Sequence, residues 1–311
     1  MKEQRPGPPC CGPARVTGAG RRDSRGLGAP MDEADAALGL RMLLAGLGAG
    51  AVAVTATRLI ERLGSRLGGV LGTAPSTIVP AGIGLAAAGR EGLDDALGAV
   101  PVGMWVNAVF LWSWRWLPRA VSAAPAALQL PLTITASLLL WAGVALAALA
   151  GLDRARAAGA PPLLLGGLAW AASLLVGALS ARGSGPPRGP ARPVGPLTLI
   201  ARGLLAAAAV AGALGAGAAF GPRAAGLAAV FPAIFLTTMV SLWLAQGQAV
   251  SGAAVGPMML GSASVGAYAL IAAHTLPAWG PALGSASAWL GAVCAVTLPA
   301  AWALTRPAAP R

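Results

Sequence analysis

An apolar stretch interrupted by prolines occurs twice in this chain and limits what the chain can fold into. Residues 67–88 carry no charge and have Pro75 and Pro80 near their middle. Residues 224–245 repeat the pattern 157 positions later, with Pro232 at the position of Pro75. Each stretch has about the 20 residues that a helix needs to cross a bilayer. The pattern predicts a membrane helix, kinked or broken by proline, that is used twice.

Composition places the whole chain among membrane proteins with several crossings. Of its 311 residues, 56% are hydrophobic and only 10% are charged, against about a quarter charged in soluble domains. The net charge is +12, but 21 of the 22 basic residues are arginines scattered between apolar runs. Such scatter marks membrane topology and argues against a nucleic-acid interface. We expect the lipid bilayer, and no nucleic acid, as a partner.

Nine apolar stretches are long enough to cross a bilayer, which predicts an all-α polytopic membrane protein. The spans are 38–58, 67–88, 96–117, 125–150, 161–181, 197–220, 224–245, 249–273 and 281–304. We expect five regions: a disordered tail (1–36), a first four-helix repeat (37–150), a bridging helix with a Pro/Gly/Arg linker (151–196), a second four-helix repeat (197–304) and a C-terminal tail (305–311). Met31 is an alternative start, so that residues 1–30 need not belong to the natural protein.

The repeat extends beyond the prolines. Gly69 matches Gly226, Leu85 matches Leu242 and, after a one-residue adjustment, Pro101 matches Pro257. Helices one to four therefore match helices six to nine, and the fifth is a bridge. Because five crossings separate equivalent helices, the second repeat would be inserted upside down. This 4+1+4 inverted-repeat arrangement is typical of secondary transporters, whose sites lie near the midplane on discontinuous helices.

Hydroxyl groups cluster around the prolines and form the candidate substrate site. Its residues are Thr73, Pro75, Ser76, Thr77, Pro80, Asn107, Pro232, Thr237 and Thr238. A proline frees backbone carbonyls, so the hydroxyls either bind a solute or satisfy those carbonyls locally. Asn107, inside the third span, either contacts the solute or joins helices by hydrogen bonds. The glycine- and alanine-rich stretches 44–53 and 206–219 are interpreted as packing faces.

Acidic residues are absent from the predicted spans. All ten lie at or before Asp153, and we assign Glu61, Glu91, Asp94, Asp95 and Asp153 to loops. Proton-coupled carriers use an intramembrane carboxylate or histidine, so a neutral or anionic solute, or facilitated passage, is favoured over strong proton coupling. The single histidine, His274, is expected at the interface. With no HExxH, Walker loop or metal-spaced cysteines, we expect no enzyme, metal or cofactor.

Arginines in short loops predict the orientation. Ten follow odd-numbered helices and four follow even-numbered ones, which favours a cytoplasmic C-terminus and an external N-terminus. Much alanine, glycine and arginine with a single lysine is typical of a high-GC bacterium. The expected location is therefore a bacterial inner membrane.

The second half also carries a loose family motif. An arginine-glycine segment leads into GPRAAGLAAVFPAIFLTT, and a polar hinge follows near Gln246–Gln248. Residues 195–304 thereby resemble small four-helix bacterial membrane proteins of the GlpM-like and domain-of-unknown-function 3147 families. The resemblance implies an integral membrane unit and brings neither catalytic residues nor a substrate. The first half departs from it, with TAPSTIVPAG in place of FPAIFLTTMV.

Two functions fit these patterns. The first is a transporter or exporter of a small solute, which needs a hydrated midplane cavity between the repeats. The alternative is a non-transporting scaffold or assembly factor, packed solid at that seam, whose arginine-rich loops dock a partner or anionic lipid.

Overall fold

The computed structural model describes Ala36 and residues 38–55, 75–87, 91–182 and 195–305. These residues form helices and turns, with no strand among them. The predicted all-α class is confirmed. Nearly all of the tail 1–36, most of the linker before residue 195 and residues 306–311 lie outside the described residues.

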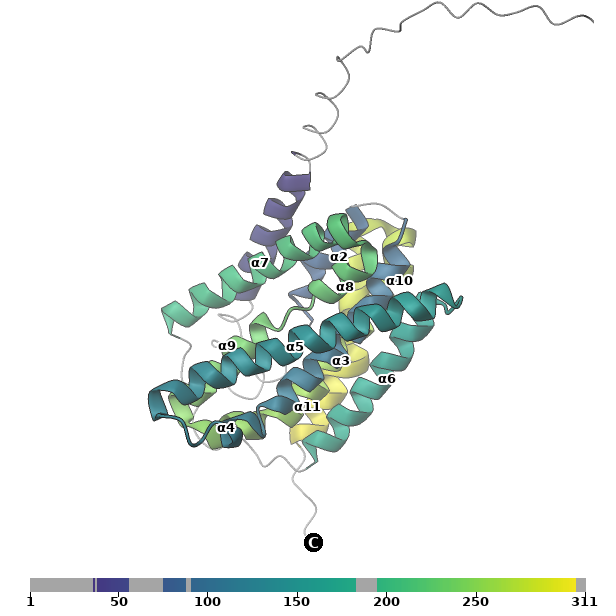
Figure 1. Ribbon diagram of the computed structural model, residues 1–311. Helices are drawn as coiled ribbons and strands as arrows, with labels where there is room; N and C mark the ends of the chain where they lie inside the picture. The colour runs from purple at the N-terminus through teal and green to yellow at the C-terminus, as the bar shows by residue number, and fades with distance from the viewer. Residues whose placement is uncertain (1–35, 37, 56–74, 88–90, 183–194, 306–311) are drawn as a thin grey trace, which may run out of the picture. The chain divides into compact units, whose positions relative to one another are not determined.

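The first helix, Leu38–Thr55, is followed in the first half by α2 (Ile78–Ala87), α3 (Leu93–Ser113), α4 (Leu117–Ala120), α5 (Ala126–Ala157) and α6 (Pro162–Ala181). The second half holds α7 (Pro196–Phe220), α8 (Pro222–Ala228), α9 (Ala233–Gln246), α10 (Gln248–Ala292), a π-helical turn (Val293–Thr297) and α11 (Leu298–Thr305). α5 lies beside α3, and α6 packs on both α3 and α10 (Figure 1).

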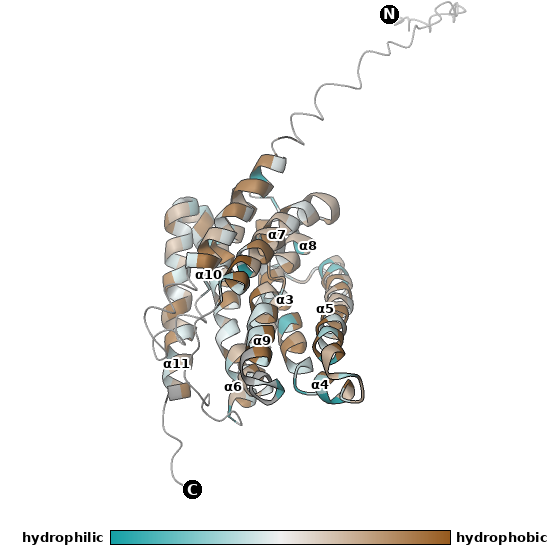
Figure 2. Cartoon of the chain, turned by 90° about the vertical axis from the view of Figure 1, so that its left-hand side faces the viewer, coloured by the Kyte–Doolittle hydropathy of each residue, from teal (hydrophilic) through white to brown (hydrophobic). Residues whose placement is uncertain are grey.

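Seven helical segments among the described residues are long and apolar enough to cross a membrane. Their outer faces are apolar too: Leu139 and Leu146 on α5 and Leu168 on α6 are more than 60% exposed. Figure 2 shows this hydrophobic colouring along α5. Large leucines exposed in such numbers are stable against lipid and not against water. The chain is therefore a multi-pass membrane protein.

The last of these segments is a hairpin. It runs over 53 residues, Gly252–Leu304, which as one straight helix would span about 80 Å, over twice the bilayer core. Gly280 interrupts it with φ 75° and ψ 174°, a conformation that only glycine adopts readily. Across this turn Thr275 Oγ1 donates to the Gly284 carbonyl at 2.8 Å, and Ile271 packs beside Gly291. The turn falls between the predicted spans 249–273 and 281–304.

The loop assignment of three acidic residues was wrong. Asp94 and Asp95 lie in the first turn of α3, where a carboxylate interacts favourably with the helix dipole. α5 ends at Ala157, seven residues beyond the predicted end at 150, so Asp153 lies on a helix as well. All three remain near helix ends, and none lies in the middle of a span.

Small residues bring the helices close together. The first helix packs on α7, where a Cβ at Gly50 would lie 3.4 Å from Ala207 Cβ. On α3, a Cβ at Gly98 would meet the Pro162 carbonyl at 2.6 Å. Such contacts replace the hydrophobic driving force that lipid removes. The predicted packing role of stretches 44–53 and 206–219 is confirmed.

Contacts divide the helix ends into two groups. At one, the Trp114 end, Arg115 Nη2 donates to the Ser180 carbonyl at 3.1 Å, and Gly252 faces the Trp114 carbonyl. At the other, the Asp95 end, the starts of α3, α6 and α8 meet the end of α5. α3 runs antiparallel to the first part of α10, because Pro101 packs beside Gly266 while Trp114 lies beside Gly252.

Two neighbouring glycines of α6 test this packing. A Cβ at Gly166 would lie 2.6 Å from the Gly98 carbonyl, whereas one at Gly167 would meet nothing within 4 Å. We expect Gly166→Ala to lower the free energy of unfolding by about 1–3 kcal/mol through overpacking. Gly167→Ala should leave it unchanged or raise it by up to about 1 kcal/mol through helix propensity. Thermal unfolding in detergent measures both, and equal effects would contradict the packing.

Candidate functional site

The second proline-interrupted stretch is broken as predicted. α8 ends at Ala228 and α9 begins at Ala233, with Val230, Phe231 and Pro232 outside both helices. The Phe231 amide donates to the Ala228 carbonyl at 3.1 Å, and the Leu236 amide donates to the Pro232 carbonyl at 2.8 Å. The backbone of the break is thus partly paired by local hydrogen bonds. The Val230 carbonyl accepts a hydrogen bond from a side chain of another helix.

Asn107 of α3 provides that contact. Its Nδ2 donates to the Val230 carbonyl at 2.7 Å, and its Oδ1 accepts from Trp141 Nε1 of α5 at 2.8 Å. The Trp141 ring packs edge-on against Phe231, with ring centroids 5.2 Å apart. Asn107 is only 1% exposed. Of the two roles left open by the sequence, the geometry supports the joining of helices, since both ends of the amide bind protein.

Arg202 of α7 reaches the other face of this region. Its Nε donates to Thr237 Oγ1 at 3.2 Å, and its Nη2 donates to Thr238 Oγ1 at 3.1 Å. Thr237 Oγ1 also donates to the Ala233 carbonyl at 2.9 Å, in the first turn of α9. The structure thus brings together two predicted site residues around a cation.

Sequence reasoning missed Arg202, although the sequence carried the signal. Arg202 lies inside the predicted span 197–220, and an ionisable residue within a span is by default a functional candidate. Its partners Thr237 and Thr238 could not be identified from spacing, because they lie on another helix.

The first stretch is described only from Pro75 onward, and Thr73 lies outside the described residues. Pro75 is buried and precedes α2, while Ser76 and Thr77 form the turn into it. Pro80 is the third residue of α2, and in a first turn proline is tolerated. The expectation that Pro80 would kink or break a helix was therefore wrong.

The two stretches contribute apolar side chains to the same core cluster. Ile78, just after Pro75, and Val230, just before Pro232, belong to one buried cluster that also holds Leu97, Met104 and Tyr268. Ser76 and Thr77 form no hydrogen bond with Thr237 or Thr238 in the part of the chain that is described. The predicted site residues are thus linked through the core and are not gathered into one polar cluster.

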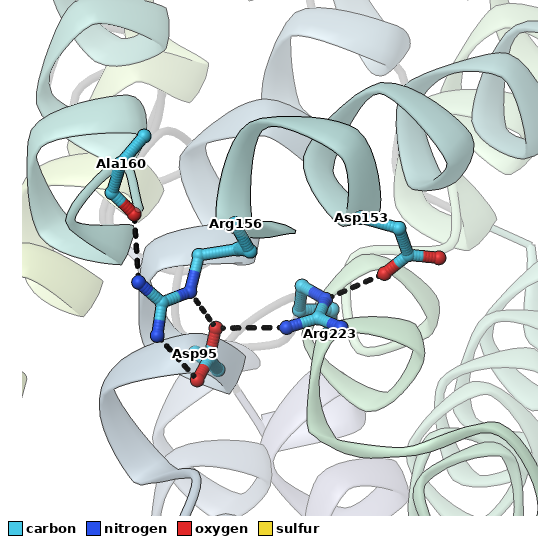
Figure 3. A network of polar contacts seen from close by, with 5 residues as sticks. All are labelled: Asp95, Asp153, Arg156, Ala160 and Arg223. Atoms are coloured by element: carbon cyan, nitrogen blue, oxygen red, sulfur yellow. Dashed lines mark hydrogen bonds and ion pairs between the residues drawn. The ribbon is translucent and has the colours of Figure 1, made fainter. Parts of the chain in front are cut away.

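A charged network at the Asp95 end joins the two halves of the chain (Figure 3). Asp95 of α3 accepts from Arg156 Nε of α5 at 2.8 Å and from Arg223 Nη1 of α8 at 3.2 Å. Arg223 Nε also binds Asp153 at 2.7 Å. The Asp95 carboxylate, whose side chain is 18% exposed, thereby bridges two arginines from different helices, and together with Asp153 it balances their charge.

Comparison with known proteins assigns no family. No family model, no curated protein and no solved structure matches the chain. Its function is therefore inferred from the chemistry of its own residues.

Asn107→Leu tests whether this amide holds the break. The change leaves the Val230 carbonyl and Trp141 Nε1 buried without their partner, so we expect about 1–3 kcal/mol of lost stability for each group. Trp141→Phe removes one of the two bonds and should cost less. Unfolding in mixed micelles measures the free energies. In a shared network the loss in the double variant differs from the sum of the two single losses. A double variant whose loss equals that sum would contradict the network.

Proposed function

We propose that this chain transports a small anionic or neutral solute across the membrane, at a site beside its two proline-interrupted helices. The observation that carries the proposal is the Arg202–Thr237–Thr238 cluster next to the Pro232 break, within an apolar span. A broken helix and a polar cluster are both costly in lipid. Discontinuous helices with polar groups at the break are the usual form of a carrier's binding site.

The count of crossings supports a transporter with nine spans. The first helix ends beside the start of α7, because Val54 contacts Gly203, and α3 begins at the Asp95 end. We therefore count one further crossing between them, of which α2 is the described part. The hairpin at Gly280 splits one of the seven candidate segments into two crossings. Together with the crossing that includes α2, this gives nine.

Equivalent helices of the proposed repeat run in opposite directions, which supports inversion. The first helix and α7 meet through Gly46 with Ala211, Gly50 with Ala207, and Val54 with Gly203. In the repeat, Gly46 is equivalent to Gly203, Gly50 to Ala207 and Val54 to Ala211. A two-fold rotation therefore relates the Gly46–Ala211 contact to the Gly203–Val54 contact and maps the Gly50–Ala207 contact onto itself. The antiparallel directions put that axis across the helices, in the membrane plane.

The charge around the site favours an anionic solute. Arg202 is the only charged side chain of α7, and residues after Asp153 contain no carboxylate side chain at all. An arginine flanked by hydroxyls provides directed donors for a carboxylate or phosphate oxygen. Ser76 and Thr77 beside Pro75 provide further hydroxyls on the equivalent helix of the other repeat. The charged network around Asp95 would close the seam between the repeats at its end.

Proteoliposome swelling tests the proposal with sodium acetate, sodium phosphate, glycerol and glycine as probes. We expect faster uptake than in protein-free liposomes for at least one probe. Arg202→Gln should lower that rate at least about tenfold through loss of charge-assisted hydrogen bonds. Thr77→Val combined with Thr238→Val should abolish it. Arg154→Gln, an exposed change near the end of α5, should have no effect. Uptake at protein-free rates for every probe would contradict transport.

The alternative is a non-transporting membrane scaffold, and close packing near the break favours it. A Cβ at Gly226 of α8 would collide with the Ala96 carbonyl of α3, and Asn107 is satisfied by protein alone. A scaffold would leave every swelling rate unchanged. An inner-membrane location with a cytoplasmic C-terminus, and the GlpM-like resemblance of residues 195–304, belong to both proposals.

A further inference from the structure

A cavity of about 600 Å³ opens at the Trp114 end of the bundle. It lies where α3 and α4 meet the start of α10, and its walls include Trp114, Arg115, Pro118, Arg119, Gln248 and Gly252. Its volume is within the range of small-molecule sites. None of these residues belongs to the proposed transport site, so the cavity needs its own explanation.

The two arginines of this cavity have no carboxylate partner among the described residues. Arg115 donates to the Ser180 carbonyl at 3.1 Å, and Arg119 donates to the Arg115 carbonyl at 2.8 Å. Neither forms an ion pair with any carboxylate that the structure describes. At the opposite end, by contrast, Arg156 and Arg223 are paired with aspartates. The cavity therefore presents two guanidinium groups that an anion would stabilise.

Tryptophans place the cavity at the level of the lipid headgroups. Trp112 and Trp116 are 52% and 40% exposed and flank the buried Trp114, in the manner of an interfacial aromatic belt. Trp114 Nε1 is buried without an acceptor among the described residues. A cavity wall that carries two arginines at this level suits a polar, acidic group.

We propose that this cavity binds a phosphate group through Arg115 and Arg119. Planar guanidinium groups bind phosphate oxygens in pairs, and basic pockets between membrane helices hold acidic headgroups. The phosphate has two possible sources, an anionic phospholipid or a soluble phosphate. The inference is independent of transport, because it uses other residues and a binding measurement.

Native mass spectrometry of the full chain tests the site with phosphatidylglycerol, phosphatidylcholine and inorganic phosphate. We expect phosphatidylglycerol to be retained in preference to phosphatidylcholine. Arg119→Gln, an exposed change that should not affect folding, weakens this binding about fivefold, and adding Arg115→Gln weakens it further. Arg154→Gln, which removes an arginine at the Asp95 end, leaves it unchanged. Thermal unfolding confirms that each variant is folded.

Inorganic phosphate distinguishes the two sources. If it leaves bound phosphatidylglycerol in place, the site takes its phosphate from lipid. If it displaces the lipid, and its own binding depends on Arg119, the soluble source is supported. Equal retention of both lipids with no effect of phosphate would overturn the proposal, as would equal losses in Arg119→Gln and Arg154→Gln.

Discussion

The fold depends on how a membrane protein satisfies backbone groups that water cannot reach. At the break before Pro232, the Val230 carbonyl is paired by Asn107, which is itself fixed by Trp141. Without such a partner the buried Val230 carbonyl would cost about 1–3 kcal/mol, so the amide stabilises the break. This one amide ties α3 to α5 and to the break between α8 and α9. The interrupted helix is therefore a stable part of the fold, and Arg202 binds the hydroxyls of Thr237 and Thr238 that follow the break.

Two polar features lie on either side of an otherwise apolar bundle. At the Asp95 end, paired charges join α3, α5 and α8 across both halves of the chain. At the Trp114 end, Arg115 and Arg119 border a cavity and have no carboxylate partner in the part of the chain that the structure describes. A third polar feature is Arg202 of α7, which is bound to the Thr237 and Thr238 hydroxyls of α9.

Much of the fold was predictable because lipid simplifies the sequence pattern. Apolar length alone predicted every long helix, and Pro232 predicted the break between α8 and α9. The positions of Asp95 and Asp153 were predicted less well, since charged residues extend helices beyond the apolar core that hydropathy detects. Asn107 was recognised as buried, yet its partners Val230 and Trp141 depend on helix packing that no local pattern encodes. Arg202 was visible in the sequence, and only the structure shows which hydroxyls it binds.

The direction of the first helix relative to α7 tests the inverted arrangement most directly. Cysteine pairs are introduced into a cysteine-free background. One set, residues 46 with 211 and 54 with 203, is close in the antiparallel arrangement. The other set, residues 46 with 203 and 54 with 211, would be close in a parallel arrangement. A protease site between residues 183 and 194 shows whether oxidation joins the two halves. Opposed repeats predict crosslinks only for Gly46 with Ala211 and Val54 with Gly203, whose neighbours lie within about van der Waals contact. Crosslinks only for Gly46 with Gly203 and Val54 with Ala211 would mean that the repeats run in the same direction, and inversion would be excluded.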